Sequence, residues 1–192
     1  VNGFSTLVAA QPTINKADGY VVYMAPGVYA GNPTKSITKS VTIYGNNYGN
    51  NPNKRVLEGT WSMAGRADET VITDQLLFSL YGNSTTTKTI TIRGITFTGA
   101  SKQGSIYVIE NRGGTGSSYW EANSKYKVRV DIRNNIFLGY NTQSSAADIN
   151  LNTASQKYGL ICNNYFRVTA ERSCSKDTTA YPKTYNRAIF AR

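Results

Sequence analysis

The chain has 192 residues, of which 40% are hydrophobic and 17% charged, and it contains 17 glycines and 14 tyrosines. This length suits one domain with a substantial core, and the many Asn, Thr, Ser, Gly and Tyr residues favour strands and turns over helices. The formal net charge is +10 and histidine is absent, which excludes a Ser-His-Asp triad, a Cys-His pair and a His-ligated zinc site within this chain.

The basic charge narrows the classes of partner. An excess of Lys and Arg attracts polyanions, although it also serves solubility alone. The basic residues are scattered and no run of them reaches five, which argues against nucleic acid and leaves acidic polysaccharide or lipopolysaccharide as the polyanion. No apolar stretch has the length of a transmembrane helix, so we expect no membrane insertion. Because the chain begins at Val1 without a visible signal peptide, we expect a processed form or a fragment of a longer protein.

The first predicted element is a short helix within residues 1–18. Apolar residues recur there every three to four positions, which is a helical period. They are Phe4, Leu7, Ala10, Ile14 and Ala17. Pro12 limits the helix to a short or kinked one. Such a segment suits the amphipathic cap that the first coil of a solenoid needs.

The next element is the stretch "VVYMAPGVYAG" at residues 21–31. Its alternating apolar residues predict a strand with Val22 or its neighbours facing the core. Pro26 and Gly27 then predict a sharp turn.

Four later segments resemble one another and predict a repeat. They are "VTIYGNNYG" (41–49), "ITIRGITFTG" (90–99), "VDIRNNIFLG" (130–139) and "GLICNNYFRV" (159–168). Each reads apolar, any residue, apolar, any residue, then Gly or Asn, and three of them continue to a Phe. The alternation places four pairs on one face, namely Val41/Ile43, Ile90/Ile92, Val130/Ile132 and Gly159/Ile161. The bend residues that follow are Gly45, Gly94, Asn134 and Asn163.

Asparagines at the third and fourth bends predict an additional contact. Asn134 or Asn135, stacked above Asn163 or Asn164, would form an asparagine ladder, in which each amide bonds to the amide of the next coil. The alternative is that these residues are only turn formers.

The spacing of the bends predicts a solenoid. The intervals are 49, 40 and 29 residues, and we interpret the first as two coils because the strand-like "QLLFSLYG" (75–82) lies inside it. The strands "SIYVIE" (105–110) and "ADINLN" (147–152) lie in the other two, and the excursion 111–124 is expected to form a loop. Short strands repeating every 20–25 residues are typical of a solenoid.

The domain prediction is a single all-β unit over residues 1–192, a fragment of a longer chain. It has a cap at 1–18, coils at 19–168 and a tail or further coil at 169–192. The segment "RAIFA" in that tail is either another strand of the solenoid or a stretch covered by a partner. We therefore expect neighbouring coils or a partner subunit at the C-terminal end.

The segments "FSTLVAAQPTINKADGYVVYMAPGVYAG" and "ITKSVTIYGNN" carry a family resemblance. They resemble the start of a right-handed parallel β-helix of the pectate-lyase-like superfamily, with "PG-x-Y" after a first strand and then "k-s-V-T-I-x-G". The opening is most similar to pectin methylesterases and to surface or tailspike β-helix proteins. The resemblance implies a right-handed parallel β-helix (solenoid) with a short N-terminal capping helix. It implies less about function, because this scaffold carries lyases, hydrolases, esterases, tailspikes and adhesins.

The catalytic signatures of these enzymes do not appear. Pectin methylesterases have a Gln-Asp-Thr step after Phe-x-Gly-Tyr, whereas "FLGY" (137–140) is followed here by Asn141-Thr142-Gln143. Pectate lyases bind calcium through clustered aspartates. Here the outward positions of the repeated strands are Thr42/Tyr44, Thr91/Arg93, Asp131/Arg133 and Leu160/Cys162, with one carboxylate among them. We interpret them as a salt-bridged outer face and predict no catalytic residue and no metal site.

One further group of acids lies in "GRADETVI" (65–72). Adjacent residues of a strand point to opposite faces, so Asp68 and Glu69 do not make a facing pair of carboxylates. We expect a loop in which Arg66 pairs with Asp68 or Glu69, leading into the strand "TVIT".

Aromatic residues in predicted loops give the candidate glycan-binding residues. Trp and Tyr stack on sugar rings and hydrogen-bond through their polar ends, and cations beside them suit an acidic glycan. The candidates are Trp61, Arg66, Arg112, Tyr119, Trp120 and Lys125. The alternative for each tryptophan is a loop plug folded over the coils. Cys162 and Cys174 form either a disulfide or two free thiols.

The leading functional prediction is a non-catalytic β-helix attachment or binding module for polysaccharide, of the phage tail/fibre or bacterial surface adhesin type. We expect it outside the cell, at the cell surface or in a virion, and without a cofactor. The first alternative is a polysaccharide lyase or pectin methylesterase-like enzyme, for which calcium would enter only as the lyase's ion. The second is a purely structural spacer in a larger assembly.

Overall fold

The computed structural model describes residues 3–32, 34–53, 66, 68–80, 86–101, 104–110, 127–138, 140–141, 147–152, 156–166 and 187–191. Within them the chain forms one helix, α1 (Leu7–Ile14), and sixteen strands. All the strand pairings are parallel. The described part of the molecule is therefore an all-β structure with a single short helix.

Three parallel sheets contain most of the strands. Sheet A is β1 (Tyr20–Tyr23), β3 (Val41–Tyr44), β6 (Thr87–Arg93), β10 (Lys127–Arg133) and β14 (Gln156–Cys162). Sheet B is β2 (Gly27–Tyr29), β4 (Thr70–Ile72), β7 (Ile95–Phe97), β11 (Ile136–Phe137) and β15 (Tyr165–Phe166). Sheet C is β5 (Leu76–Leu80), β9 (Ile106–Glu110), β13 (Ala147–Asn152) and β16 (Arg187–Ala191). A small pair is formed by β8 (Ala100–Ser101) and β12 (Tyr140–Asn141).

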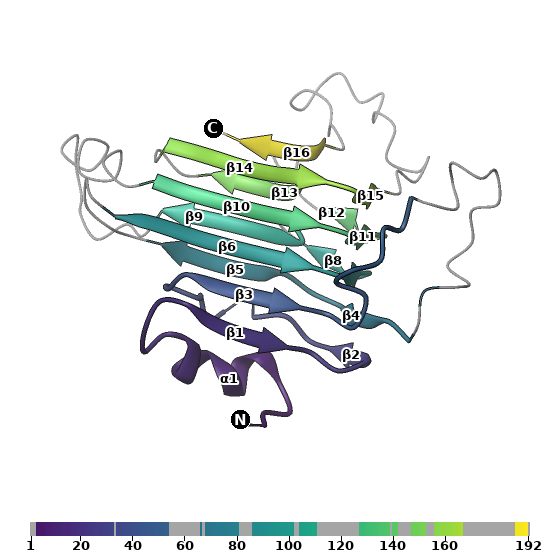
Figure 1. Cartoon of the computed structure of the whole chain (residues 1–192), viewed down its shortest axis with the longest axis horizontal. Coiled ribbons are helices and arrows are strands. Elements are labelled where there is room, and N and C mark those ends of the chain that lie inside the picture. The colour runs from purple at the N-terminus through teal and green to yellow at the C-terminus, as the bar shows by residue number, and fades with distance from the viewer. Residues whose placement is uncertain are drawn as a thin grey trace, which may run out of the picture.

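The chain passes through these sheets repeatedly in the same order, A, then B, then C. Each passage makes one layer, and the layers stack from α1 at one end to β16 at the other (Figure 1). Parallel pairing without hairpins follows from this route, because each strand meets the corresponding strand of the next layer. The arrangement is compatible with a parallel β-helix.

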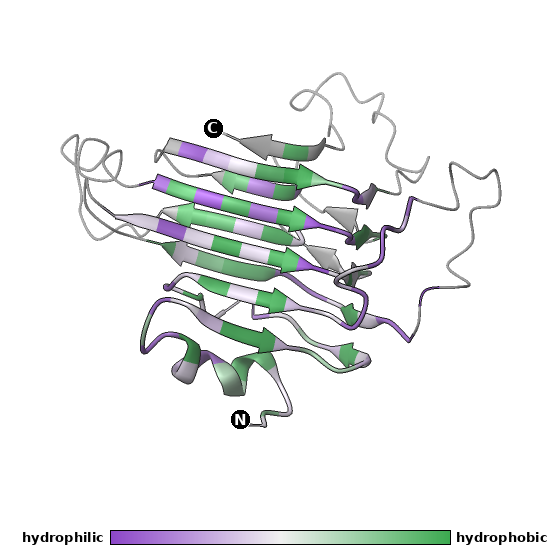
Figure 2. Ribbon diagram, viewed as in Figure 1, coloured by the Kyte–Doolittle hydropathy of each residue, from purple (hydrophilic) through white to green (hydrophobic). Residues whose placement is uncertain are grey.

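The apolar residues of sheet A form the inner columns that the sequence predicted. The register aligns Val41, Ile90, Val130 and Gly159, and beside them Ile43, Ile92, Ile132 and Ile161. Ile43, Ile92 and Ile132 have no exposed surface. Hydrophobic and hydrophilic residues alternate along β10, as its bands of colour show (Figure 2). Residues with a period of two therefore build the core in the layers of β3, β6 and β10.

The bend between sheets A and B repeats from layer to layer. Gly94, Asn134 and Asn163 adopt left-handed φ values of 73°, 60° and 55°, which Gly and Asn tolerate best. Gly45 does not share this conformation. Glycine is required there for another reason, because a Cβ on it would lie 2.2 Å from the carbonyl oxygen of Gly94.

The asparagine ladder is confirmed, and its members are Asn135 and Asn164. The amide Nδ2 of Asn135 donates to Oδ1 of Asn164 at 3.1 Å, and the backbone N–H of Asn135 donates to the same oxygen at 3.0 Å. Asn135 also donates to the Ile92 carbonyl and accepts from the Ile95 N–H. These bonds satisfy polar groups that the bend would otherwise bury without partners.

Just beyond the bend, three phenylalanines stack in the core. The rings of Phe97 and Phe137 are 5.0 Å apart and those of Phe137 and Phe166 4.8 Å apart, with interplanar angles of 5° and 6°. The shared Phe of the repeated segments thus becomes a continuous aromatic column.

The capping helix is also confirmed, over a shorter range than 1–18. Thr6 caps α1 by accepting from the Ala9 N–H at 3.1 Å, and Pro12 lies inside the helix. Leu7, Ala10 and Ile14 are buried, whereas Phe4 is 44% exposed. In Figure 1, α1 lies beneath β1 and covers that end of the core. No helix in the described ranges is long and apolar enough to cross a membrane.

The interpretation of the 49-residue interval as two coils is wrong. β3 pairs directly with β6, so the interval is one layer. The stretch 75–82 contributes β5 to sheet C of that same layer, and the additional residues lie between β3 and β4. The "RAIFA" segment is β16, which pairs with β13 as a further strand of sheet C.

Candidate functional site

The segment that follows β3 crosses the layers instead of staying in its own. We call its described residues, 46–53, the asparagine strap. From the end of β3 the strap runs along the bends to the level of β15 (Figure 1). At its start, the Asn46 backbone N–H donates to Thr70 Oγ1 at 2.9 Å and its side chain donates to the Asp68 carbonyl at 2.9 Å.

Two later bonds hold the strap against distant layers. Asn134 donates from Nδ2 to the Tyr48 carbonyl at 2.8 Å, and Asn53 donates from Nδ2 to the Asn164 carbonyl at 3.0 Å. The left-handed bend at Gly94 leaves space for the strap, since a Cβ there would lie 2.1 Å from the Tyr48 nitrogen. The strap therefore lies directly on the bends between sheets A and B, which are formed by Gly94, Asn134 and Asn163.

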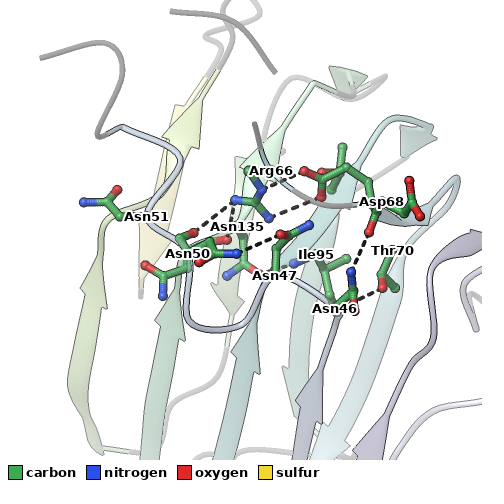
Figure 3. A network of polar contacts seen from close by, with 12 residues as sticks. Asn46, Asn47, Asn50, Asn51, Arg66, Asp68, Thr70, Ile95 and Asn135 are labelled. Carbon is green, nitrogen blue, oxygen red and sulfur yellow. Dashed lines mark hydrogen bonds and ion pairs between the residues drawn. The ribbon is translucent and has the colours of Figure 1, made fainter. Parts of the chain in front are cut away.

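Arg66 ties the strap to the neighbouring strands (Figure 3). Its guanidinium donates to the Asn50 and Asn134 carbonyls at 3.3 and 3.0 Å. It also forms an ion pair with Glu69, with Nε 2.6 Å from Oε1, and the Arg66 side chain is only 7% exposed. Burial lowers the pKa of Arg66, while the charge and hydrogen bond of Glu69 oppose that shift. The predicted local pair is thus Arg66 with Glu69.

The strap places one tyrosine beside two others on the outer face of sheet A. Tyr44 and Tyr48 stack with ring centroids 4.9 Å apart, and Tyr23 lies 5.4 Å from Tyr44. We call these three residues the tyrosine cluster. Tyr23 is 71% and Tyr48 47% exposed, so the cluster presents aromatic surface to solvent. Parallel register supplies Tyr23 and Tyr44, and the strap supplies Tyr48.

A charged group continues the same face across β6 and β10. Arg93, in register with Tyr44, has its guanidinium carbon 5.8 Å from the Tyr44 ring centroid, a cation–π contact. Arg93 also forms an ion pair with Asp131. Arg133 binds the same carboxylate through Nε at 2.6 Å and a second nitrogen at 2.9 Å. This confirms the predicted salt-bridged outer face.

The electrostatics of this group keep Asp131 ionised. Burial is the largest influence and raises the pKa of Asp131, but the hydrogen bonds and charges of Arg133 and Arg93 together outweigh it and hold that pKa below its usual value. In return, the hydrogen bond to Asp131 raises the pKa of Arg133. Arg93 and Arg133 share the single negative charge of Asp131, so one positive charge remains in excess.

Aromatic rings beside fixed cations suit the recognition of a ring-shaped, hydroxyl-rich or anionic ligand. The tyrosine faces offer stacking surface with polar ends, and the arginines offer planar donors. The strands and the strap hold the groups in place before a ligand arrives, which lowers the entropic cost of binding. The described residues contain no group of three or more Cys, Asp and Glu that could hold a metal ion.

Of the six residues proposed for glycan contact from sequence, the structure describes Arg66. Its contacts to Glu69, Asn50 and Asn134 give it a tethering role in the strap. The others lie outside the described residues and stay predictions, namely Trp61, Arg112, Tyr119, Trp120 and Lys125. Cys162 ends β14, and Cys174 lies outside the described ranges, so their pairing also stays a prediction.

Sequence reasoning missed the tyrosine cluster. Tyr44 was placed on the outer face, but without a partner, because Tyr48 belongs to a polar loop whose path the sequence did not reveal. The available signal was the column itself, since Tyr23 and Tyr44 occupy equivalent positions at the ends of "YVVY" and "VTIY".

Comparison with protein-family models, with curated proteins and with solved structures gave no match to this chain.

Proposed function

We propose that the chain is a non-catalytic polysaccharide-binding module, built as a right-handed parallel β-helix of the pectate-lyase-like kind and acting outside the cell, at a cell surface or in a virion. The observation that carries the proposal is the exposed tyrosine cluster, fixed by sheet A and by the strap. Exposed aromatic groups on a rigid scaffold are a common feature of binding surfaces. We propose that the rings stack on the sugar faces while Arg93 and Arg133 hydrogen-bond to substituents.

Three carboxylates in the described part of the chain are held in ion pairs. Asp131 is bound by two arginines, Glu69 by Arg66 and Thr96, and Asp18 by Lys88 at 2.7 Å. Burial raises the pKa of Asp131 and of Asp18, but the hydrogen bonds and charges of their cationic partners, together with the Ser40 N–H at Asp18, hold both pKa values below the usual one. These two carboxylates are therefore poor general acids. The alternative of a lyase or esterase draws no support from these two residues.

The test is polysaccharide binding by tyrosine variants, measured by affinity electrophoresis in gels that contain the polymer. Tyr44→Ala removes the central ring and should weaken polysaccharide binding roughly tenfold. The variant loses the stacking of Tyr44 on the sugar, and the Tyr48 ring loses the partner that holds it in place. Tyr44→Phe keeps the ring and should bind nearly as the wild type. Phe4→Ala, which removes an exposed aromatic ring in the N-terminal segment, is the matched control.

An activity screen against acidic polysaccharides, with and without calcium, separates the enzyme alternative. Unsaturated products or released methanol would overturn the non-catalytic proposal. Binding that is equal in the wild type and Tyr44→Ala would remove the tyrosine cluster from the proposal, and absence of binding to every polymer would favour the structural spacer.

A further inference from the structure

The outer face of sheet A has a second region, at the opposite end of the strands from the tyrosine cluster. Lys127 and Arg129 lie there on β10, and both are exposed. Alternate residues of a strand share a face, so they point to the same side as Asp131 and Arg133. Arg129 precedes Arg133 by four residues, which is about 13 Å along the strand.

These two cations have no ion-pair partner among the described residues. The register places Thr89 of β6 and Tyr158 of β14 on either side of Arg129. The adjacent carboxylate on the same face, Asp131, is already bound by Arg93 and Arg133. The outward groups of β6 and β10 therefore comprise four cations and one anion, and two of the three excess positive charges lie at Lys127 and Arg129.

Tyr158 adds an aromatic ring to this region. It is 48% exposed and lies in register with Arg129 on the adjacent strand. Adjacent parallel strands are about 4.8 Å apart, so Arg129 and Tyr158 occupy neighbouring positions on the same face of the sheet. The region thus repeats the composition of the other end, an exposed tyrosine beside an arginine, with the difference that its cations have no ion-pair partner among the described residues.

Resting on the proposed function, we propose that Lys127 and Arg129 bind the anionic substituents of the same polysaccharide, its carboxylates or sulfate esters. Arg129 offers a planar pair of donors that matches either group, and Lys127 adds a point charge beside it. A linear polymer would then run along sheet A, with sugar rings on the tyrosine cluster and Tyr158 and an acidic group between Lys127 and Arg129.

The experiment compares two double variants that remove the same charge. Lys127→Gln/Arg129→Gln removes the proposed donors, and Lys16→Gln/Lys35→Gln removes two exposed lysines outside the strands. Binding is measured by isothermal titration with three polymers: polygalacturonate for carboxylates, dextran sulfate for sulfate esters and dextran as the neutral polymer. Thermal unfolding midpoints establish that each variant is folded.

We expect the wild type to bind one of the anionic polymers more tightly than dextran. Lys127→Gln/Arg129→Gln should weaken that binding roughly tenfold, since two partly exposed ionic contacts together contribute about that factor. It should leave dextran binding unchanged, and the lysine control should behave as the wild type with all three polymers. The anionic polymer that responds identifies the substituent.

Four other results would overturn the inference. Equal weakening by both double variants would show that net charge alone attracts the polymer. Wild-type binding that depends on Tyr44 but is no tighter for anionic polymers would remove the anion site while the proposed function stands. Absence of binding to all three polymers would remove both. Equally tight binding of duplex DNA through the same two residues would show a general polyanion surface.

Discussion

The two faces of sheet A use the same strands and the same register, yet they differ in how much they vary from layer to layer. On the inner face, Ile43, Ile92, Ile132 and Ile161 repeat one residue type across four layers. On the outer face, the adjacent column changes its residue type at two of its four steps, through Tyr23, Tyr44, Arg93, Arg133 and Cys162.

This difference shows that the fold restricts the residue type on the inner face of sheet A more than on its outer face. An inner side chain must fit both the residue above and the residue below, so one well-fitting residue is repeated. An outer side chain has solvent on one side, and its identity is free to serve a ligand. If the comparison holds, inner substitutions should change the free energy of unfolding, and outer ones should change binding.

The largest effect is expected for Ile132→Ala. Ile132 has no exposed surface and lies between Ile92 and Ile161, so truncation leaves a cavity that its neighbours cannot fill. We expect a loss of about 2–5 kcal/mol in the free energy of unfolding, measured by urea denaturation. Arg129→Ala, on the outer face of the same strand, should change it by less than about 0.5 kcal/mol. Similar losses for both variants would contradict the division between the faces.

Asn135→Ala tests the ladder at the edge of the inner face. Its loss leaves the Ile92 carbonyl and the Ile95 N–H without their partners. We expect a loss of about 1–3 kcal/mol, measured in the same way. Asn164→Ala removes the acceptor of the hydrogen bond between the two side chains. The double variant should therefore lose less free energy of unfolding than the sum of the two single variants. Strict additivity would mean that the two amides act independently.

Gly94→Ala tests whether the bend is coupled to the outer face. A Cβ at this left-handed residue would lie 2.1 Å from the Tyr48 nitrogen, so the strap must move. We expect a loss of about 1–3 kcal/mol from backbone strain together with weaker polysaccharide binding, because Tyr48 is displaced from Tyr44. Gly49→Ala is the control within the strap, since a Cβ there meets no atom within 4 Å. Unchanged binding in Gly94→Ala would separate the bend from the site.

The smallest effect is expected for Asp131→Asn, and it should depend on pH. The pKa of Asp131 is lower in the folded chain than in the unfolded one, so its ion pairs stabilise the fold above about pH 4. That stabilisation is lost as the pH falls through the lower folded pKa. At pH 7 the variant should lose at most about 1 kcal/mol, since the groups are partly exposed. A difference that persists in strong acid would contradict the ion-pair explanation.

The inner face was predictable because it depends on local pattern. Alternation in "ITIRG" and "VDIRNN" predicted the strands and the inward residues, and Gly94 and Asn134 at their ends predicted the left-handed bends. Stacking equivalent positions then gave the asparagine ladder and the salt-bridged column, since parallel register aligns residues by their place in the repeat.

The site was less predictable because it depends on contacts between distant residues. Tyr48 reaches Tyr44 only because the strap bonds to Asn134, 86 residues away. No periodicity marks such a path, and the same excursion made one long layer look like two coils. Local spacing predicts a pair of Arg66 with Asp68 or Glu69, but it does not predict the bond from Arg66 to the Asn134 carbonyl, 68 positions away.

The strap also has a consequence for the order of folding. Neighbouring layers pair strands that are 21 to 49 residues apart in the chain, whereas Asn53 bonds to Asn164 across 111 residues. Contacts at such separation form late, because much of the chain must be ordered first. The docking place of Asn53 exists only once the layer of β14 has been added. Closure of the strap therefore follows the addition of the β14 layer, and Tyr48, whose carbonyl accepts from Asn134, reaches Tyr44 only after β10 has joined the stack.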